Sequence, residues 1–127
     1  MRRRVSVSGP LDLQSAWERY LLPQRWPSWA PQIRSVDVAE ELLRPRLTGV
    51  VRGPLGLAVR FRVDEVDPET HTWAWTVMAR GVRVHMRHDL TRTPGATVAG
   101  LTVDGPALVA LAYPPCAVLP LHRLLRR

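Results

Sequence analysis

The sequence of 127 residues has no lysine and only one cysteine, Cys116. A single cysteine excludes an internal disulfide and a metal cage built from several cysteines. It suits a reducing compartment, so we expect a cytoplasmic protein. The absence of lysine, set against 18 arginines, indicates codon bias rather than a need for guanidinium geometry. Cys116 lies in an apolar stretch, which favours a small buried residue over a nucleophile.

Long hydrophobic runs are also missing. The longest apolar stretch covers residues 107–121, without a charged residue, and contains three prolines. It is shorter than the roughly 20 residues that a membrane-spanning helix needs. The basic residues after Met1 are not followed by an apolar run, so the sequence predicts no secretory signal. We therefore expect no membrane span.

The net charge of +7 is concentrated at the two ends of the chain. Six arginines lie within residues 2–4 and 123–127, and the stretch between them carries 12 arginines against all 11 acidic residues. A basic patch could contact RNA or DNA, but no recognition motif accompanies it, and terminal arginines are more often solvated ends. A nucleic-acid partner is therefore the least favoured of the functions considered.

The pattern of the first third of the chain predicts a strand, a helix and a turn region. Residues 4–8 alternate polar and apolar side chains, which predicts a strand with one buried face. Asp12 is placed to cap a helix whose apolar residues recur at helical spacing up to Pro23. Residues 23–31 then combine three prolines with two tryptophans, which predicts a compact turn region anchored by the indole rings.

The middle of the chain, from residue 33 to residue 104, has no helical period. It consists of strand-like segments separated by turn signals such as the one at residues 67–70. The short turns predict an antiparallel meander. The predicted strands cover residues 33–40, 42–52, 57–66, 71–80, 82–92 and 96–104.

The C-terminal part opens with Gly105 and Pro106 and continues as a helical stretch. We expect Pro114 and Pro115 to interrupt this helix, which then resumes from Cys116. The chain has material for one hydrophobic core and shows no linker or repeat. The sequence thus predicts a single α+β domain over residues 1–127.

Six short segments follow one another in an order that resembles one family. They are residues 11–17 (LDLQSAW), 26–31 (WPSWAP), 66–68 (VDP), 73–75 (WAW), 88–90 (HDL) and 105–106 (GP). With this order the chain resembles the START-like helix-grip superfamily (SRPBCC), and within it the polyketide cyclase/dehydrase-like branch.

The resemblance implies a curved antiparallel sheet of about six or seven strands packed around a C-terminal helix. An internal cavity between them serves lipid transfer, hormone sensing or polyketide ring closure in different relatives, so the fold alone does not decide the function. Because prolines interrupt the C-terminal helix here, we expect a more open cavity, or one closed by a partner.

Strand parity predicts which side chains face this cavity, because alternate residues of a strand point to opposite faces. On three neighbouring strands apolar residues alternate with arginine, threonine and histidine, so the apolar set faces inward. Large aromatics at such positions are more often core than ligand contacts, and the two roles are compatible. The residues that we expect to bind a ligand are Trp73, Trp75, Phe61, Val59, Met86, Val84 and Trp29.

His88 and Tyr113 are the candidate catalytic residues. Parity places His88 on the apolar wall, where an imidazole can act as acid, base or orienting donor. A core histidine satisfied by the backbone is the more frequent arrangement, as is a packed tyrosine with a solvated hydroxyl. The four histidines lack the spacing of metal ligands, and we expect neither a metal nor a cofactor.

Two functions share this fold and cavity. The first is a cyclase- or dehydratase-like enzyme of secondary metabolism that acts without a metal, by positioning and a few proton transfers. The second is a non-catalytic carrier or sensor of an apolar metabolite, which would explain the few acid-base groups on the wall. The sequence leaves open which applies, which small hydrophobic or aromatic molecule is bound, and the oligomeric state.

Overall fold

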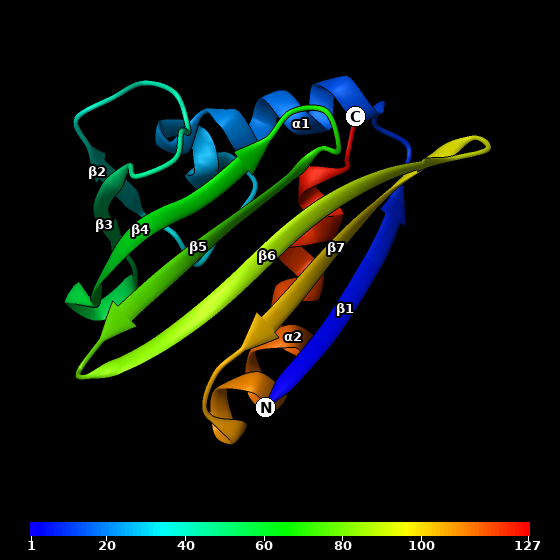
Figure 1. The fold of residues 1–127 in the computed structure, drawn as a ribbon. Helices are drawn as coiled ribbons and strands as arrows, with labels where there is room; N and C mark the ends of the chain where they lie inside the picture. Colours follow the sequence, from blue (N-terminus) through cyan, green and yellow to red (C-terminus); the bar gives the residue numbers. More distant parts are fainter.

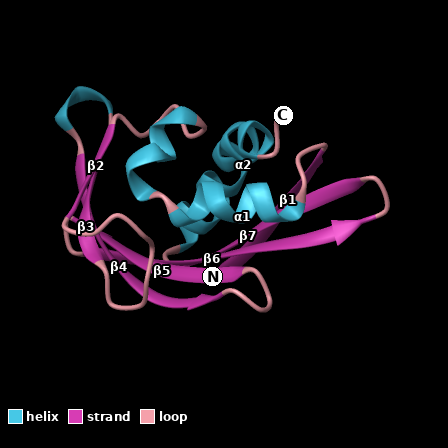
Figure 2. Ribbon diagram, turned by 90° about the horizontal axis from the view of Figure 1, so that it is seen from above, coloured by secondary structure: helices cyan, strands magenta, loops and turns pink.

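The computed structural model describes residues 1–127 as one seven-stranded antiparallel sheet with the helices on one face (Figures 1 and 2). Figure 2 shows the sheet curving around the two α-helices. This confirms the α+β, helix-grip architecture. The elements are β1 (Arg2–Gly9), α1 (Leu13–Leu21), the 3₁₀ helix η1 (Pro23–Ser28), β2 (Ser35–Val38), β3 (Thr48–Arg52), the 3₁₀ helix η2 (Pro54–Gly56), β4 (Ala58–Asp67), β5 (Thr72–Ala79), β6 (Val82–Thr93), β7 (Ala96–Asp104) and α2 (Ala107–Leu124).

The strands lie in the order β1-β7-β6-β5-β4-β3-β2. From β2 to β7 each strand pairs with the next one along the chain, which is the predicted meander. β1 pairs with β7 and forms one edge of the sheet. Beside this pair, the amino group of Met1 donates a hydrogen bond to the carbonyl of Gly105 at 3.0 Å. The bounds of β4 to β7 agree with the predicted strands to within one residue.

The strand predicted over residues 42–52 begins only at Thr48. Pro45 has no N–H to give to a ladder, and Arg46 adopts the left-handed region with φ of 70°. The chain therefore turns before the strand starts. Arg46 and Leu47 do bond to Val63 of β4, so the prediction was wrong because the apolar pattern does not show this turn, not because pairing is absent.

α1 begins where the sequence predicts. The carboxylate of Asp12 accepts a hydrogen bond from the backbone N–H of Ser15 at 3.0 Å, which satisfies one of the free amides of the first turn. The buried face of the helix consists of Ala16, Trp17 and Tyr20. This face packs toward the sheet and brings Tyr20 into the core.

α2 is a continuous helix, so the interruption expected at Pro114 and Pro115 was wrong. Each proline lacks an N–H, and the carbonyls four residues earlier, at Ala110 and Leu111, lose their helical partner. Packing of the buried face of α2 against β1 and β7 offsets this loss. Helix phase also places Cys116 on the exposed side, contrary to the expectation of a buried cysteine.

The last turn of α2 is tied to α1 by Arg19. Its Nη1 donates to the carbonyl of Leu124 at 2.6 Å and to that of Arg126 at 2.7 Å. Carbonyls at a helix end have no partner within the helix, so the guanidinium group replaces the missing donors. Arg19 therefore joins two helices that lie at opposite ends of the sequence.

By length and hydropathy α2 would be able to cross a membrane. About a third of it is buried in this fold, where Leu121 and Leu124 belong to the core. The core helix of a sheet protein meets the same criteria, so this finding is weak evidence for a membrane span. The other side of the helix carries exposed Leu108, Leu111 and Leu119.

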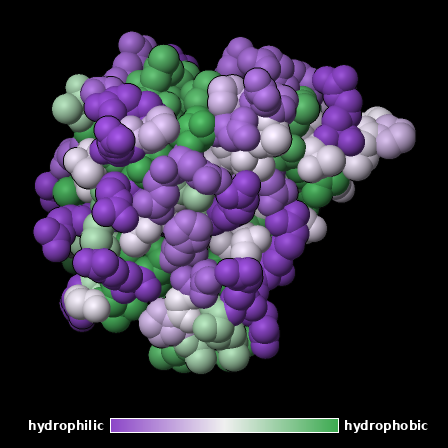
Figure 3. Space-filling model, in the orientation of Figure 1, coloured by the Kyte–Doolittle hydropathy of each residue, from purple (hydrophilic) through white to green (hydrophobic).

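The outer face of the sheet is charged. Arg4 and Asp89 form a two-pronged ion pair, with Nη–Oδ distances of 2.6 and 2.9 Å, and Arg87 pairs with Glu65. Gly100 lies beside the first pair, and a Cβ there would come within 2.6 Å of the Asp89 carboxylate. Figure 3, which looks onto this face, shows hydrophilic side chains across the middle of the sheet. The inner face is consequently the apolar one.

Candidate functional site

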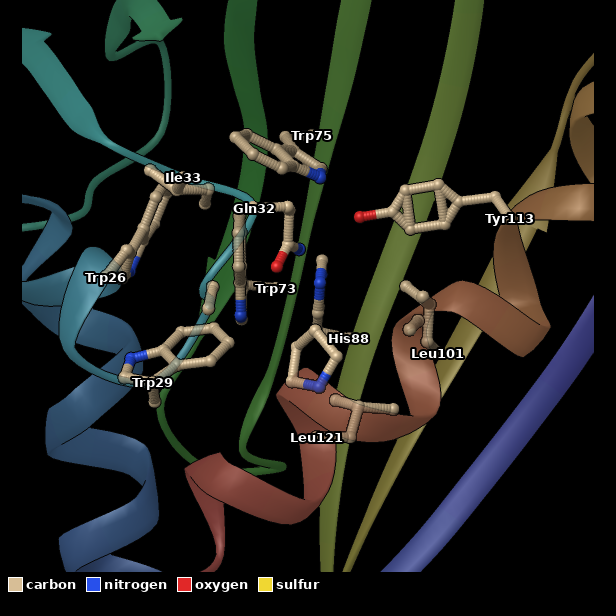
Figure 4. Close-up of a pocket in the computed structure, with 13 residues that line it drawn as sticks. Trp26, Trp29, Gln32, Ile33, Trp73, Trp75, His88, Leu101, Tyr113 and Leu121 are labelled. Atoms are coloured by element: carbon tan, nitrogen blue, oxygen red, sulfur yellow. The ribbon is translucent and has the colours of Figure 1, made fainter. Parts of the chain in front are cut away.

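A small cavity lies between the inner face of the sheet, α2 and the segment that follows α1 (Figure 4). The volume of this cavity is about 40 Å³, which is room for a few waters. Ten of its 13 lining residues are hydrophobic. The lining residues are Trp26, Trp29, Ala30, Gln32, Ile33, Trp73, Trp75, His88, Leu101, Tyr113, Ala117, Pro120 and Leu121.

The sheet side of the cavity is built on one row of paired residues. Trp73 of β5 lies opposite His88 of β6, and His88 lies opposite Leu101 of β7. Trp75 is two residues further along β5 and therefore points to the same face. All four side chains are buried, as parity predicts for the inner face.

The side opposite β5 comes from η1 and the residues after it. The indole N–H of Trp26 donates to the carbonyl of Tyr20 at 3.0 Å, and the ring stacks against Trp73 with centroids 5.5 Å apart. Trp29 follows and meets Tyr20 edge-on at 5.6 Å. Both indoles are buried, which confirms that they anchor the turn region.

His88 is enclosed by aromatic rings. Its imidazole stacks on Trp73, with centroids 4.2 Å apart and planes 5° from parallel, and Tyr20 meets it edge-on. Burial lowers the pKa of His88 from 6.5 to about 3, against a smaller opposing effect of the Asp89 carboxylate. The ring is therefore neutral at physiological pH. Its Nδ1 is buried without a hydrogen-bond partner, so this is not the backbone-satisfied core histidine that the sequence favoured.

Tyr113 reaches the cavity from α2. Figure 4 shows its hydroxyl turned toward the indole nitrogen of Trp75 and the amide of Gln32. Burial raises the pKa of Tyr113, and the Gln32 amide lowers it by less. The hydroxyl is therefore protonated at neutral pH. Of the two arrangements considered for Tyr113, the structure shows the one in which the hydroxyl faces the cavity.

Residues 2–114 match a family model described as polyketide cyclase / dehydrase and lipid transport. The chain belongs to this family. The resemblance drawn from the order of the sequence motifs is thus confirmed. No curated protein sequence matches the chain.

Solved structures share the fold of this polyketide cyclase/dehydrase family member at low identity. Ara h 8.0201 is 15% identical with a TM-score of 0.75, over 98% of this chain and 94% of that one. A protein from Nitrosospira multiformis is 11% identical with a TM-score of 0.81, over 98% and 94%. DynU16, from the dynemicin biosynthetic locus, is 19% identical with a TM-score of 0.79, over 98% of this chain. The match spans only 45% of DynU16.

Five residues that the sequence singled out line the cavity of this family member. They are Trp29, Trp73, Trp75, His88 and Tyr113. The other four, Phe61, Val59, Met86 and Val84, do not line it.

Strand register explains why these four lie elsewhere. Phe61 and Val84 occupy the row beyond Trp75 toward the β5–β6 turn, and Val59 lies one row further. Met86 is opposite Trp75 and is packed into the core. Parity assigned the correct face, but it does not say how far along each strand the cavity extends.

The sequence did not point to the remaining eight lining residues. For Leu101 the alternation within residues 96–104 carried a signal, because it faces the same side as the buried Ala99 and Val103. The others reach the cavity through the course of the segment after η1 and through the unbroken α2. They are Trp26, Ala30, Gln32, Ile33, Ala117, Pro120 and Leu121.

Proposed function

We propose that this protein binds a small aromatic molecule in the cavity beneath α2. The observation that carries the proposal is the aromatic lining, in which Trp29, Trp73, Trp75 and His88 surround one mostly apolar space. Aromatic faces and edges favour a planar ligand through stacking and edge-on contacts. Membership of a family that joins cyclases, dehydrases and lipid transport supports a role in handling small organic molecules.

The first test compares two variants of α2. Ala117→Leu enlarges a lining residue, whereas Ala112→Leu adds the same atoms at an exposed position of the same helix. Native mass spectrometry of gently purified protein should show a small-molecule adduct in the wild type and in Ala112→Leu. The adduct should fall by about tenfold or more in Ala117→Leu, because a filled cavity excludes the ligand.

Circular dichroism of both variants verifies that they fold. Equal adducts in the two variants would place the ligand outside the cavity. Protein that carries no adduct, and binds no aromatic probe in solution, would overturn the proposal.

A cyclase- or dehydratase-like activity is the second candidate, and one observation favours it. His88 and Tyr113 are the only titratable groups in the lining, and both face the same space. A histidine with a pKa of about 3 is a weak base at neutral pH, so it would act as a neutral hydrogen-bonding group. Catalysis would then rest on holding a reactive chain in a productive shape.

The molecule identified by mass spectrometry decides between enzyme and carrier. If the protein is an enzyme, His88→Phe and Tyr113→Phe should each lower turnover by about tenfold or more while binding changes little. Turnover that survives both substitutions would remove these residues from the chemistry. Binding without any conversion of the molecule would identify a carrier or sensor.

The proposal also covers the cellular setting of this function. We infer a cytoplasmic protein from its single cysteine. The likeness to DynU16, a protein of a biosynthetic locus, supports a place in secondary metabolism. Fractionation of the native host and deletion of the gene, followed by metabolite profiling, would test the two statements separately.

A further inference from the structure

Polar atoms without partners gather around the cavity. Six buried side-chain nitrogen and oxygen atoms make no hydrogen bond, and five of them belong to one aromatic cluster. The sixth is Nε of Arg123, a residue of α2 that does not line the cavity. Four of the five residues line the cavity, and Tyr20 contacts three of those four. The five atoms are Tyr20 Oη, Trp29 Nε1, Trp73 Nε1, Trp75 Nε1 and His88 Nδ1.

Three of these atoms are indole nitrogens, which donate and cannot accept. Buried polar groups nearly always have a partner, and a buried donor left without one costs free energy. Trp26 provides an internal comparison, because its indole belongs to the same cluster and donates to the carbonyl of Tyr20. The protein therefore supplies an acceptor for Trp26 but none for Trp29, Trp73 and Trp75. Figure 4 shows the nitrogen of Trp29 on the side of its ring away from Tyr113, so an occupant of the cavity, a water or a ligand, can bring an acceptor to the other two.

The surroundings indicate that this acceptor is uncharged. No arginine lines the cavity, and His88 is neutral at physiological pH. A buried anion without a counter-charge is strongly unfavourable, because burial removes its hydration. A carboxylate is therefore a poor occupant, whereas a carbonyl oxygen accepts two hydrogen bonds without carrying a charge.

We propose that the unpartnered indoles make the cavity selective for a neutral aromatic carbonyl compound over hydrocarbons and carboxylates. The proposal rests on the proposed function and specifies its ligand. Figure 4 shows the indole nitrogen of Trp75 and the hydroxyl of Tyr113 turned toward the same space, so a carbonyl oxygen placed there would accept from both. The cavity of about 40 Å³ is smaller than a single aromatic ring, so the lining has to move apart to admit one.

The test uses three benzene derivatives of similar size: acetophenone, ethylbenzene and benzoate. Titration calorimetry should give acetophenone an affinity about tenfold or more above that of ethylbenzene, and benzoate should bind more weakly than acetophenone. A purely apolar cavity predicts the reverse order for the first pair, because ethylbenzene is the more hydrophobic. Ethylbenzene equal to or tighter than acetophenone would overturn the carbonyl selectivity but leave the proposed function standing.

Benzoate bound as tightly as acetophenone would overturn the neutrality of the acceptor. If none of the three probes binds, both the proposed function and this inference are overturned.

Indole resonances report the contact in the unaltered protein. The chain has five tryptophans, whose Nε1–H signals separate in a ¹H–¹⁵N spectrum and are assigned with single Trp→Phe variants. Acetophenone should shift the Trp75 signal, whereas Trp26, which already has an acceptor, should barely move. A shift of all five signals alike, or of none while the probe binds, would overturn the proposal.

A pair of variants gives a second readout. Trp75→Phe keeps a ring but removes the donor, and should lower acetophenone affinity by about tenfold without weakening ethylbenzene. Trp17→Phe is the matched control, because Trp17 is buried in the core but does not line the cavity. Equal losses for both probes in Trp75→Phe would show that the ring, and not its N–H, matters.

Discussion

Gly9 and Leu125 are in contact so close that no side chain fits on Gly9. A Cβ built there would lie 2.6 Å from the Cβ of Leu125 and 3.1 Å from its carbonyl oxygen. The same carbonyl accepts a hydrogen bond from the backbone N–H of Leu11 at 2.9 Å. Gly9 ends β1 and Leu125 follows α2, so this contact joins the end of the C-terminal helix to the first strand.

Gly9→Ala should therefore destabilise the protein, because the added methyl group must push α2 away from β1. We expect the free energy of unfolding to fall by about 1–3 kcal/mol in urea denaturation. Ser8→Ala, at the exposed neighbouring position, should change it by less than about 0.5 kcal/mol. Equal stability of the two variants would show that the end of α2 is free to move.

The buried His88 predicts a specific pH dependence of stability. Its folded-state pKa of about 3 lies below the reference value of 6.5, so the unfolded chain binds more protons between these values. The contribution is complete above about pH 6.5 and decreases as the pH falls toward 3, by up to ~1.4 kcal/mol per pH unit. His88→Phe, which keeps an aromatic ring beside Trp73, should lose this part of the dependence.

The measurement is urea unfolding of the wild type and His88→Phe at several pH values from 4 to 7. His122→Phe, at an exposed histidine of α2, controls for the loss of one imidazole and should follow the wild type. Parallel curves for the wild type and His88→Phe would contradict the neutral, buried state of His88.

Pro115 should limit the stability of α2. It is exposed, and its missing N–H leaves the carbonyl of Leu111 without a helical partner. Pro115→Ala restores the donor and should raise the free energy of unfolding by about 1–3 kcal/mol. Pro114→Ala should gain less, because Pro114 is buried and its ring contacts are lost. Slower hydrogen exchange in α2 of Pro115→Ala would locate the effect, and an unchanged rate would contradict it.

The two-residue turn between β5 and β6 stores backbone strain. Arg80 and Gly81 have φ of 51° and 77°, and positive φ at both positions is the geometry that favours Asn-Gly. Arg80→Asn should stabilise the protein by about 1 kcal/mol in thermal unfolding, because asparagine adopts this region more readily. Arg80→Ala removes the same charge without relieving the backbone. A gain of equal size in both variants would assign the effect to charge.

The sequence predicted well the local features of the fold and the face of the sheet to which each strand residue points. Asp12 caps α1 because a cap needs only its own helix, and β4 to β7 follow from alternation and turn residues. The same reasoning erred at Thr48 and at the prolines of α2. At Thr48 the cause is the local turn at Pro45 and Arg46, whereas for α2 it is packing against β1 and β7, which no local pattern contains.

The candidate site could likewise be predicted from the sequence only in part. The sequence by itself determined that Trp73, Trp75 and His88 share the inner face, because a period of two is a property of the strand alone. Only the tertiary structure decided that Tyr113 and Gln32 meet them across a small cavity, and that three indole N–H groups there have no acceptor. Burial and hydrogen-bond partners depend on segments distant along the chain, so they exist only once the sheet has curved around α2.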